Sequence, residues 1–204
     1  MTITFKLKTL FFLAFLLCQV MSLQAQTTLT DEEEKLYKER VAVKIEELQE
    51  NLSAMASKEY DSETKQTFQE VALRLFMNQG QGVTAENSTI DLNTQKEVRK
   101  RQPIKTYFQR LCNLPYATVK LTKTQVCKIS NLYKKGDDEN GNPIYSATAA
   151  YFQGFEGYDK DGRLVYRDKV MKTVTIELHK TTDVTGGRWA VLFGDIQVAG
   201  TKVK

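Results

Sequence analysis

The chain is poor in the residues on which much hydrolytic and metal-dependent chemistry relies. It has one histidine, three cysteines and three prolines among 204 residues, and it contains no GxSxG, P-loop or GxGxxG motif. Catalytic triads and common zinc sites depend on histidine or on clusters of histidine and cysteine. We therefore predict no catalytic triad, no metal site and no bound cofactor. The lone His179 falls on the polar face of its predicted strand, near a turn, where we expect it to contact solvent.

An apolar run long enough to span a membrane is also missing. Leu10–Cys18 reads LFFLAFLLC and is shorter than the roughly 20 residues of a spanning helix. Lys6 and Lys8 precede this run, and the small residue Ala25 follows it at a tolerable cleavage site. A basic start, a short apolar run and a small residue are typical of a secretory signal peptide. The sequence therefore predicts that residues 1–25 are a signal peptide and are removed.

The remaining residues, 26–204, have an ordinary globular composition and are predicted to form a single α+β domain. We expect this domain to be exported, either to the periplasm or out of the cell. Leu17 stands where a lipidated cysteine needs a small neighbour, so we expect no lipid anchor through Cys18. Loss of two lysines with the signal leaves 27 of the 29 basic residues against 25 acidic ones. This near-neutral balance argues against a nucleic-acid partner.

The first part of this domain has the apolar spacing of helices. Thr30 and Glu33 form a capping-box pattern, and apolar residues then recur every three or four positions, which predicts a helix over residues 31–57. The same spacing predicts a second helix over residues 62–78 and a short third helix that starts at Pro103. We expect the apolar stripe of the first helix to lie on a core. Self-association through that stripe, giving a homo-oligomer, is the alternative.

Residues 96–105 (KEVRKRQPIK) carry the one basic cluster. Nucleic-acid channels interleave aromatic residues with such charges, and this segment has none. We interpret it as a solvated face at the start of the third helix, with a polyanion site as the alternative. The polar segment before it leaves room for a very short strand at residues 90–92.

From Tyr116 onward the apolar period changes to two, which is the period of half-buried strands. In residues 164–178 apolar side chains fall on even positions, and a Gly-Gly turn leads from there to a second apolar run over residues 189–198. Turn-rich segments separate these two apolar runs from two earlier runs that have the same period of two. The predicted fold class is therefore α+β, with about three N-terminal helices packed on a four-stranded antiparallel β-meander.

This layout resembles the nuclear transport factor 2-like superfamily. The resemblance is carried by the element order, by the long C-terminal strands and by the closing run WAVLFGDIQV, residues 189–198. It implies helices on a strongly bent antiparallel sheet that encloses an apolar pocket. The superfamily includes ketosteroid isomerase-like enzymes, carrier-like binders and periplasmic domains of secretion machines, so the resemblance does not select one function.

Aromatic residues near the predicted helix–sheet interface are candidate binding residues. Tyr151, Tyr166 and Trp189 could line a pocket and offer it a polar group, and ordinary core packing accounts for them equally well. Asp195 shares strand parity with Trp189 and is a candidate carboxylate for the same pocket.

Asp168 is the candidate with the clearest chemistry. It shares a strand face with Tyr166 and Val170, the face expected to turn toward the helices. A carboxylate among apolar side chains has a raised pKa and can serve as a general base. The alternative is that residues 167–169 form a bulge that turns Asp168 to solvent.

Two cysteines remain after the signal, Cys112 and Cys127. An even pair in an oxidising compartment predicts a disulfide, and two buried thiols are the alternative.

These features favour an exported, non-catalytic binding or assembly protein of the cell envelope. Its expected partner is an envelope protein or a small apolar ligand, with no spanning membrane segment. The alternative is a small pocket enzyme of the isomerase or dehydratase type that uses Asp168 as general base.

Overall fold

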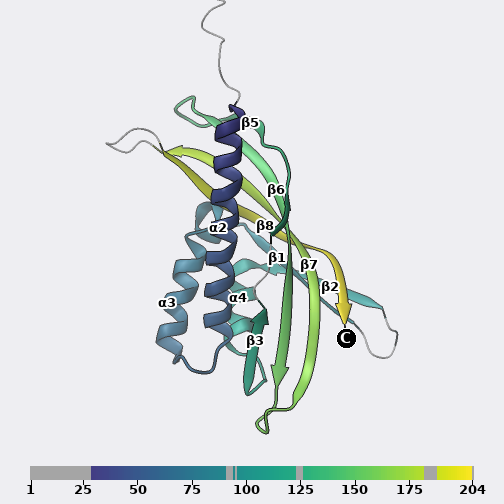
Figure 1. The fold of residues 1–204 in the computed structure, drawn as a ribbon. Helices are drawn as coiled ribbons and strands as arrows, with labels where there is room; N and C mark the ends of the chain where they lie inside the picture. The colour runs from purple at the N-terminus through teal and green to yellow at the C-terminus, as the bar shows by residue number, and fades with distance from the viewer. Residues whose placement is uncertain (1–28, 91–93, 95, 123–125, 182–187, 204) are drawn as a thin grey trace, which may run out of the picture.

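The computed structural model describes residues 29–90, 94, 96–122, 126–181 and 188–203. Within them, three α-helices, a short 3-10 helix and eight strands form an α+β fold (Figure 1). The predicted signal peptide and its cleavage site lie outside the described residues. No described helix combines the length and the apolar composition required to cross a bilayer.

Helix α2 (Asp31–Ala56) begins and ends close to its predicted limits. The Thr30 hydroxyl accepts a hydrogen bond from the Glu33 amide at 3.2 Å, and the Glu33 carboxylate accepts one from the Thr30 amide at 2.9 Å. This reciprocal pair is the capping box expected from the sequence. The predicted first helix is therefore confirmed together with its starting residue.

Helix α3 (Ser62–Leu73) is shorter than predicted, because tertiary pairing interrupts it. The Phe193 amide donates a hydrogen bond to the Leu75 carbonyl at 2.8 Å, which draws the chain out of the helix and onto the sheet. The 3-10 segment η2 (Met77–Gly80) then turns the chain with positive φ angles at Asn78, Gln79 and Gly80. Packing outweighs local helix propensity at this point.

The basic segment forms an edge strand, which corrects its assignment to the start of a helix. Strands β1 (Thr84–Ile90) and β2 (Glu97–Pro103) pair antiparallel over seven residues, and helix α4 (Ile104–Cys112) follows directly. Only Gln102 is buried in β2, while the basic side chains are exposed. Charged side chains are common on edge strands because they stay in water and discourage pairing with another chain.

The remaining strands complete a curled, mixed sheet. They are β3 (Thr118–Thr122), β4 (Val126–Ile129), β5 (Tyr133–Asp137), β6 (Pro143–Tyr158), β7 (Leu164–Thr181) and β8 (Arg188–Val203). The main order is β2-β1-β8-β7-β6-β3, with β4 and β5 also paired to β6. The predicted four-stranded antiparallel meander is not confirmed. The described sheet has eight strands, and β1 pairs parallel with β8. Strands β3, β4 and β5 each pair with a different part of β6. The local sequence pattern of a strand does not specify which strand it pairs with.

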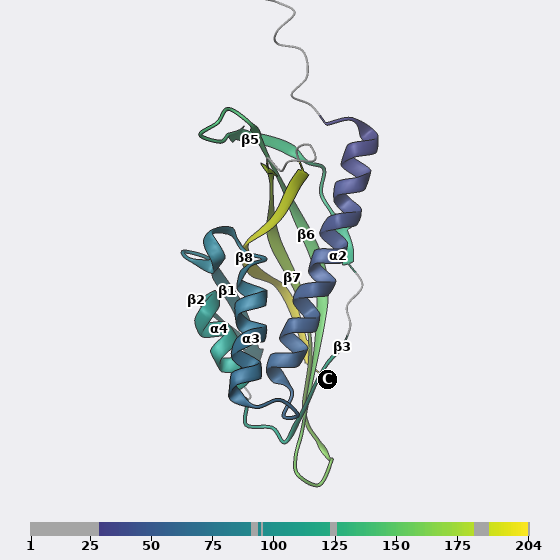
Figure 2. The same cartoon turned by 90° about the vertical axis from the view of Figure 1, so that its left-hand side faces the viewer.

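The long strands β6, β7 and β8 arch over the helices, and α2 runs along their concave side (Figures 1 and 2). A continuous apolar core fills the space between them. From α2 it takes Ile45, Leu48 and Leu52, and from the sheet it takes residues such as Ile176 and Phe193, all essentially inaccessible to solvent. The long strands continue beyond this core, and a pocket lies at the end where they meet α4 and β3.

Candidate functional site

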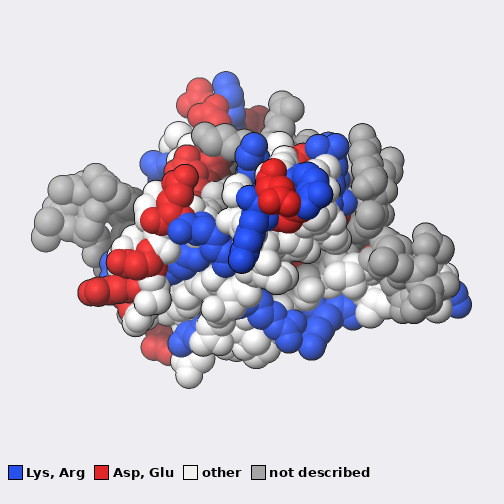
Figure 3. Space-filling view, turned by 90° about the horizontal axis from the view of Figure 1, so that it is seen from below, with Lys and Arg blue, Asp and Glu red and all other residues white. Residues whose placement is uncertain are grey.

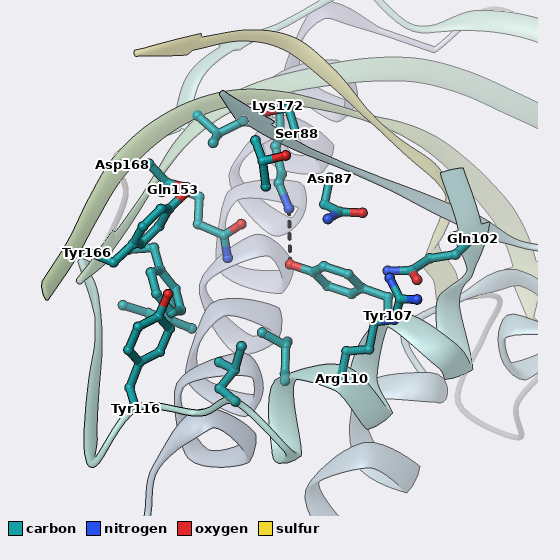
Figure 4. Close-up of a pocket in the computed structure, with 16 residues that line it drawn as sticks. Asn87, Ser88, Gln102, Tyr107, Arg110, Tyr116, Gln153, Tyr166, Asp168 and Lys172 are labelled. Carbon is teal, nitrogen blue, oxygen red and sulfur yellow. Dashed lines mark hydrogen bonds between the residues drawn. The ribbon is translucent and has the colours of Figure 1, made fainter. Parts of the chain in front are cut away.

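A pocket of about 290 Å³ lies between α4, the β1–β2 hairpin and the lower parts of β6 and β7 (Figure 4). Pockets that bind small organic molecules start at roughly this size. Its lining combines an apolar and aromatic wall with several polar side chains, and two of the predicted site residues, Tyr166 and Asp168, belong to it.

Asp168 is held on the pocket side of β7. The β6–β7 pairing runs without a shift from Gln153 opposite Val170 to Gly157 opposite Tyr166, so the structure has no bulge in that pairing at Asp168. The Tyr166 hydroxyl donates a hydrogen bond to Asp168 Oδ2 at 2.7 Å. Burial raises the pKa of Asp168, and it outweighs the opposing effects of this hydrogen bond and of the positive charge nearby. Burial therefore makes the charged form of Asp168 less favourable than it would be in water.

Three aromatic rings form the wall beside Asp168. Tyr116 stacks on Tyr166 with ring centroids 6.1 Å apart, and Phe155 packs against each of them with centroids at 5.6 Å. Gly157 on β6 makes this arrangement possible, because a Cβ at that position would lie 2.6 Å from the Tyr116 ring. Sequence reasoning missed Tyr116 as a site residue, because its position depends on the loop before β3, where the Ala117 amide donates a hydrogen bond to the Tyr158 carbonyl of β6.

Lys172 is the functional candidate that sequence reasoning missed on β7. Its side chain is only 4% exposed, and its Nζ donates a hydrogen bond to the Tyr107 hydroxyl at 3.0 Å while lying 4.8 Å from the centre of that ring. Lys172 occupies an even position, four residues beyond Asp168 on the same inward face. Strand parity could have identified it, but a lysine in an alternating run is ordinarily counted among the solvent-facing residues.

The opposite wall carries three amide side chains. Asn87 from β1 lies beside Lys172, and Gln102 from β2 lies at the other end of the Tyr107 ring (Figure 4). Gln153 from β6 donates a hydrogen bond to Gln49 Oε1 on α2 at 3.3 Å. The exposed Arg110 of α4 completes this polar side. These residues come from elements far apart in sequence, so no spacing signal joins them.

Tyr151, Trp189 and Asp195 lie away from the pocket. Tyr151 is fully buried, and burial, with a smaller effect of Tyr107, raises the pKa of its hydroxyl. Its oxygen finds no hydrogen-bond partner among the described residues. Trp189 packs edge-on against Tyr145 at 5.5 Å, at the far end of the sheet. The structure therefore brings together two of the five predicted binding residues.

Asp195 is displaced from the inward face by an irregularity in β8. The β7–β8 register shifts between Val174 opposite Ile196 and Ile176 opposite Phe193, so strand parity changes at this point. The Asp195 carboxylate instead accepts a hydrogen bond from the Thr84 amide at 2.8 Å. It contributes to the junction between β8 and β1.

Cys112 and His179, which were also singled out in the sequence, lie outside the pocket. Cys112 has a free, half-buried thiol whose Sγ accepts a hydrogen bond from Gln69 Nε2 at 3.0 Å. The side chain of Cys127 lies outside the described residues, so the disulfide stays a prediction. His179 Nε2 lies 2.9 Å from Glu177 Oε2, and its side chain keeps partial contact with solvent.

The described residues hold no group of three or more histidine, cysteine, aspartate or glutamate side chains that could bind a metal ion. The pocket instead combines aromatic rings, a carboxyl group whose pKa is raised by burial, and a buried ammonium group. Comparison of the sequence with family models and with curated proteins gives no match to either.

Proposed function

We propose that this protein is an exported, non-catalytic binding protein that holds a small organic molecule in the pocket between α4 and the curled sheet. The supporting observation is that Asp168 and Lys172 line one small cavity, where Asp168 accepts a hydrogen bond from the Tyr166 hydroxyl and Lys172 donates one to the Tyr107 hydroxyl. The described residues form no salt bridge between them. Burying charged groups is costly unless they are paired, and a core that served packing alone would be better filled with apolar side chains. A ligand that contacts these groups offsets that cost.

The same features support the proposal that the chain is related to the nuclear transport factor 2-like superfamily. Three helices lie on a curled sheet, and a pocket opens beside the long strands. This relationship remains a proposal about fold and does not choose a ligand.

Blocking the pocket tests the binding function. Leu121 of β3 lines the cavity, and Leu121→Trp should fill much of it, whereas Leu164→Trp places the same bulk at an exposed position of β7. Binding of small aromatic compounds, measured by ligand-observed NMR, should be lost in the first variant and kept in the second. Melting curves without ligand show whether each variant is folded, because overpacking can cost about 1–3 kcal/mol. Equal binding by both variants would place the ligand elsewhere and overturn the proposal.

A second candidate is a small enzyme with Asp168 as general base. The raised pKa of Asp168, caused by burial, supports it, since a base works best when its pKa approaches the working pH. The Tyr166 hydroxyl would orient the carboxylate. Loss of proton exchange from an acidic C–H of a bound ketone in Asp168→Asn, with binding retained, would favour this candidate over the binding protein.

A further inference from the structure

Lys172 is a buried cation to which the described residues offer one hydrogen-bond acceptor. An ammonium group has three donors, and Lys172 Nζ uses one of them on the Tyr107 hydroxyl. No carboxylate of the described residues lies within 4.0 Å of it, although the side chain is only 4% exposed. The Tyr107 ring adds a cation–π contact, which is weaker than a hydrogen-bonded counter-ion.

The side chains around Lys172 add further hydrogen-bond donors and acceptors. Asn87 lies beside Lys172, whereas Gln102 lies at the other end of the Tyr107 ring with the Arg110 guanidinium beside it (Figure 4). Gln102 is only 6% exposed, so it is built into the wall of the cavity. Lys172 and Arg110 thus line the same pocket and can bind an anion through charged donors. The Asn87 Oδ1 and Gln102 Oε1 atoms find no partner among the described residues and can accept hydrogen bonds from other parts of a ligand.

The surface at this end of the molecule has a matching charge. Figure 3 views the molecule from the end at which α4 and β3 lie in Figure 1, and it shows Lys and Arg side chains gathered across the middle of that face. Asp and Glu side chains gather toward one edge of the same face, and some lie in its middle beside the Lys and Arg side chains. The Lys and Arg side chains of this face attract anions, while the acidic side chains among them weaken that attraction.

The other side of the cavity suits an apolar group. Tyr116, Phe155 and Tyr166 form its aromatic wall, as described above. Asp168 lies on this side, four residues before Lys172 on the same face of β7, and the positive charge of Lys172 opposes the effect of burial on its pKa. A ligand whose anionic group binds Lys172 can place an attached ring on the aromatic wall.

We propose that the ligand is a small organic carboxylate with an aromatic or similarly apolar body, whose carboxylate binds Lys172 and whose body packs on Tyr116, Phe155 and Tyr166. This proposal rests on the proposed binding function and names the class of ligand. A cavity of about 290 Å³ limits that body to roughly one or two rings.

Phenylacetate and its neutral isostere phenylacetamide test the proposal, with inorganic phosphate as an anion that has no apolar body. Affinities are measured by calorimetry on the exported protein and on two variants. Lys172→Met removes the buried charge and keeps the length of the side chain. Lys160→Met makes the same change at an exposed turn position and is the control.

The wild type should bind phenylacetate more tightly than phenylacetamide. Lys172→Met should weaken phenylacetate binding by about tenfold to a hundredfold, as expected for loss of a hydrogen bond to a charged group. It should leave phenylacetamide binding nearly unchanged, and Lys160→Met should behave as wild type. Nuclear Overhauser contacts between the ligand ring and Tyr116 or Phe155 in the wild type provide a test that needs no folded variant.

Three results would overturn the proposal. These are phenylacetate binding that is unaffected by Lys172→Met, tighter binding of phenylacetamide than of phenylacetate, and binding of phosphate as tight as that of phenylacetate. If other aromatic compounds bind and phenylacetate does not, the carboxylate class is wrong and the binding function stands. If no compound binds in a pocket-dependent manner, the binding function itself fails.

Discussion

Replacing Asp168 by Asn should stabilise the folded protein at neutral pH. Asn has nearly the same shape and can still accept the hydrogen bond that the Tyr166 hydroxyl donates to Asp168. The change removes a charge that burial disfavours, as the raised pKa of Asp168 shows. The exchange of a charge-assisted hydrogen bond for a neutral one costs about 1 kcal/mol and opposes the gain. Because the pKa is raised in spite of that bond, we expect a net gain on the order of 1 kcal/mol.

The pH dependence of this gain has a definite sign. A carboxyl group with a raised pKa in the folded state stabilises the fold fully only below its unfolded pKa, near 3.9 for Asp, and this contribution is lost as pH rises through the folded pKa. Wild type and Asp168→Asn should therefore differ little in stability at about pH 3 and diverge as the pH rises to 7.

Urea denaturation at a series of pH values measures this difference. At pH 7 the variant should also melt higher by roughly 2–4 °C, given the size of the domain. Asp161→Asn, at an exposed turn position, is the control and should change the stability by less than about 0.5 kcal/mol at every pH. A variant that is less stable than wild type at pH 7, with a gap that closes in acid, would show that Asp168 is stabilised by its charge and refute the reasoning.

Three further predictions concern the core, the aromatic wall and processing. Leu48→Ala should cost about 2–5 kcal/mol in urea denaturation because Leu48 is fully buried under the sheet, and a cost below about 1 kcal/mol would mean that the core collapses around the gap. Gly157→Ala should cost about 1–3 kcal/mol and displace Tyr116, whose ring lies 2.6 Å from the added Cβ, whereas Gly136→Ala meets no atom within 4 Å and should be tolerated. The intact mass of the exported protein should correspond to loss of residues 1–25 without an added lipid, and a lipid-bearing mass would contradict the signal-peptide assignment.

Sequence reasoning was accurate where the determining interactions are local. The capping box joins Thr30 to Glu33, three positions along the chain, and the start of α2 that it predicts is confirmed. The alternation in β7 is equally local, and Val170, Val174 and Ile176 are buried as their parity predicts. A reader of the sequence could thus place Asp168 on the inward face, because no bulge interrupts the β6–β7 pairing around it.

The amino-acid pattern by itself determined the α+β class, the long helix and the inward faces of the long strands, since helical and strand periodicities depend on neighbouring residues. Tertiary structure alone decided the partners of each strand and the contents of the pocket. The parallel β1–β8 contact and the hydrogen bond from the Thr84 amide to Asp195 join residues about 110 positions apart. The register shift beside Asp195 depends on how β8 pairs with β7, and it changes the strand parity that the sequence predicts. Lys172 meets Tyr107 in the same way, across 65 positions. Such contacts form only when the whole sheet curls around the helices, so the local apolar periodicity of the sequence does not predict them.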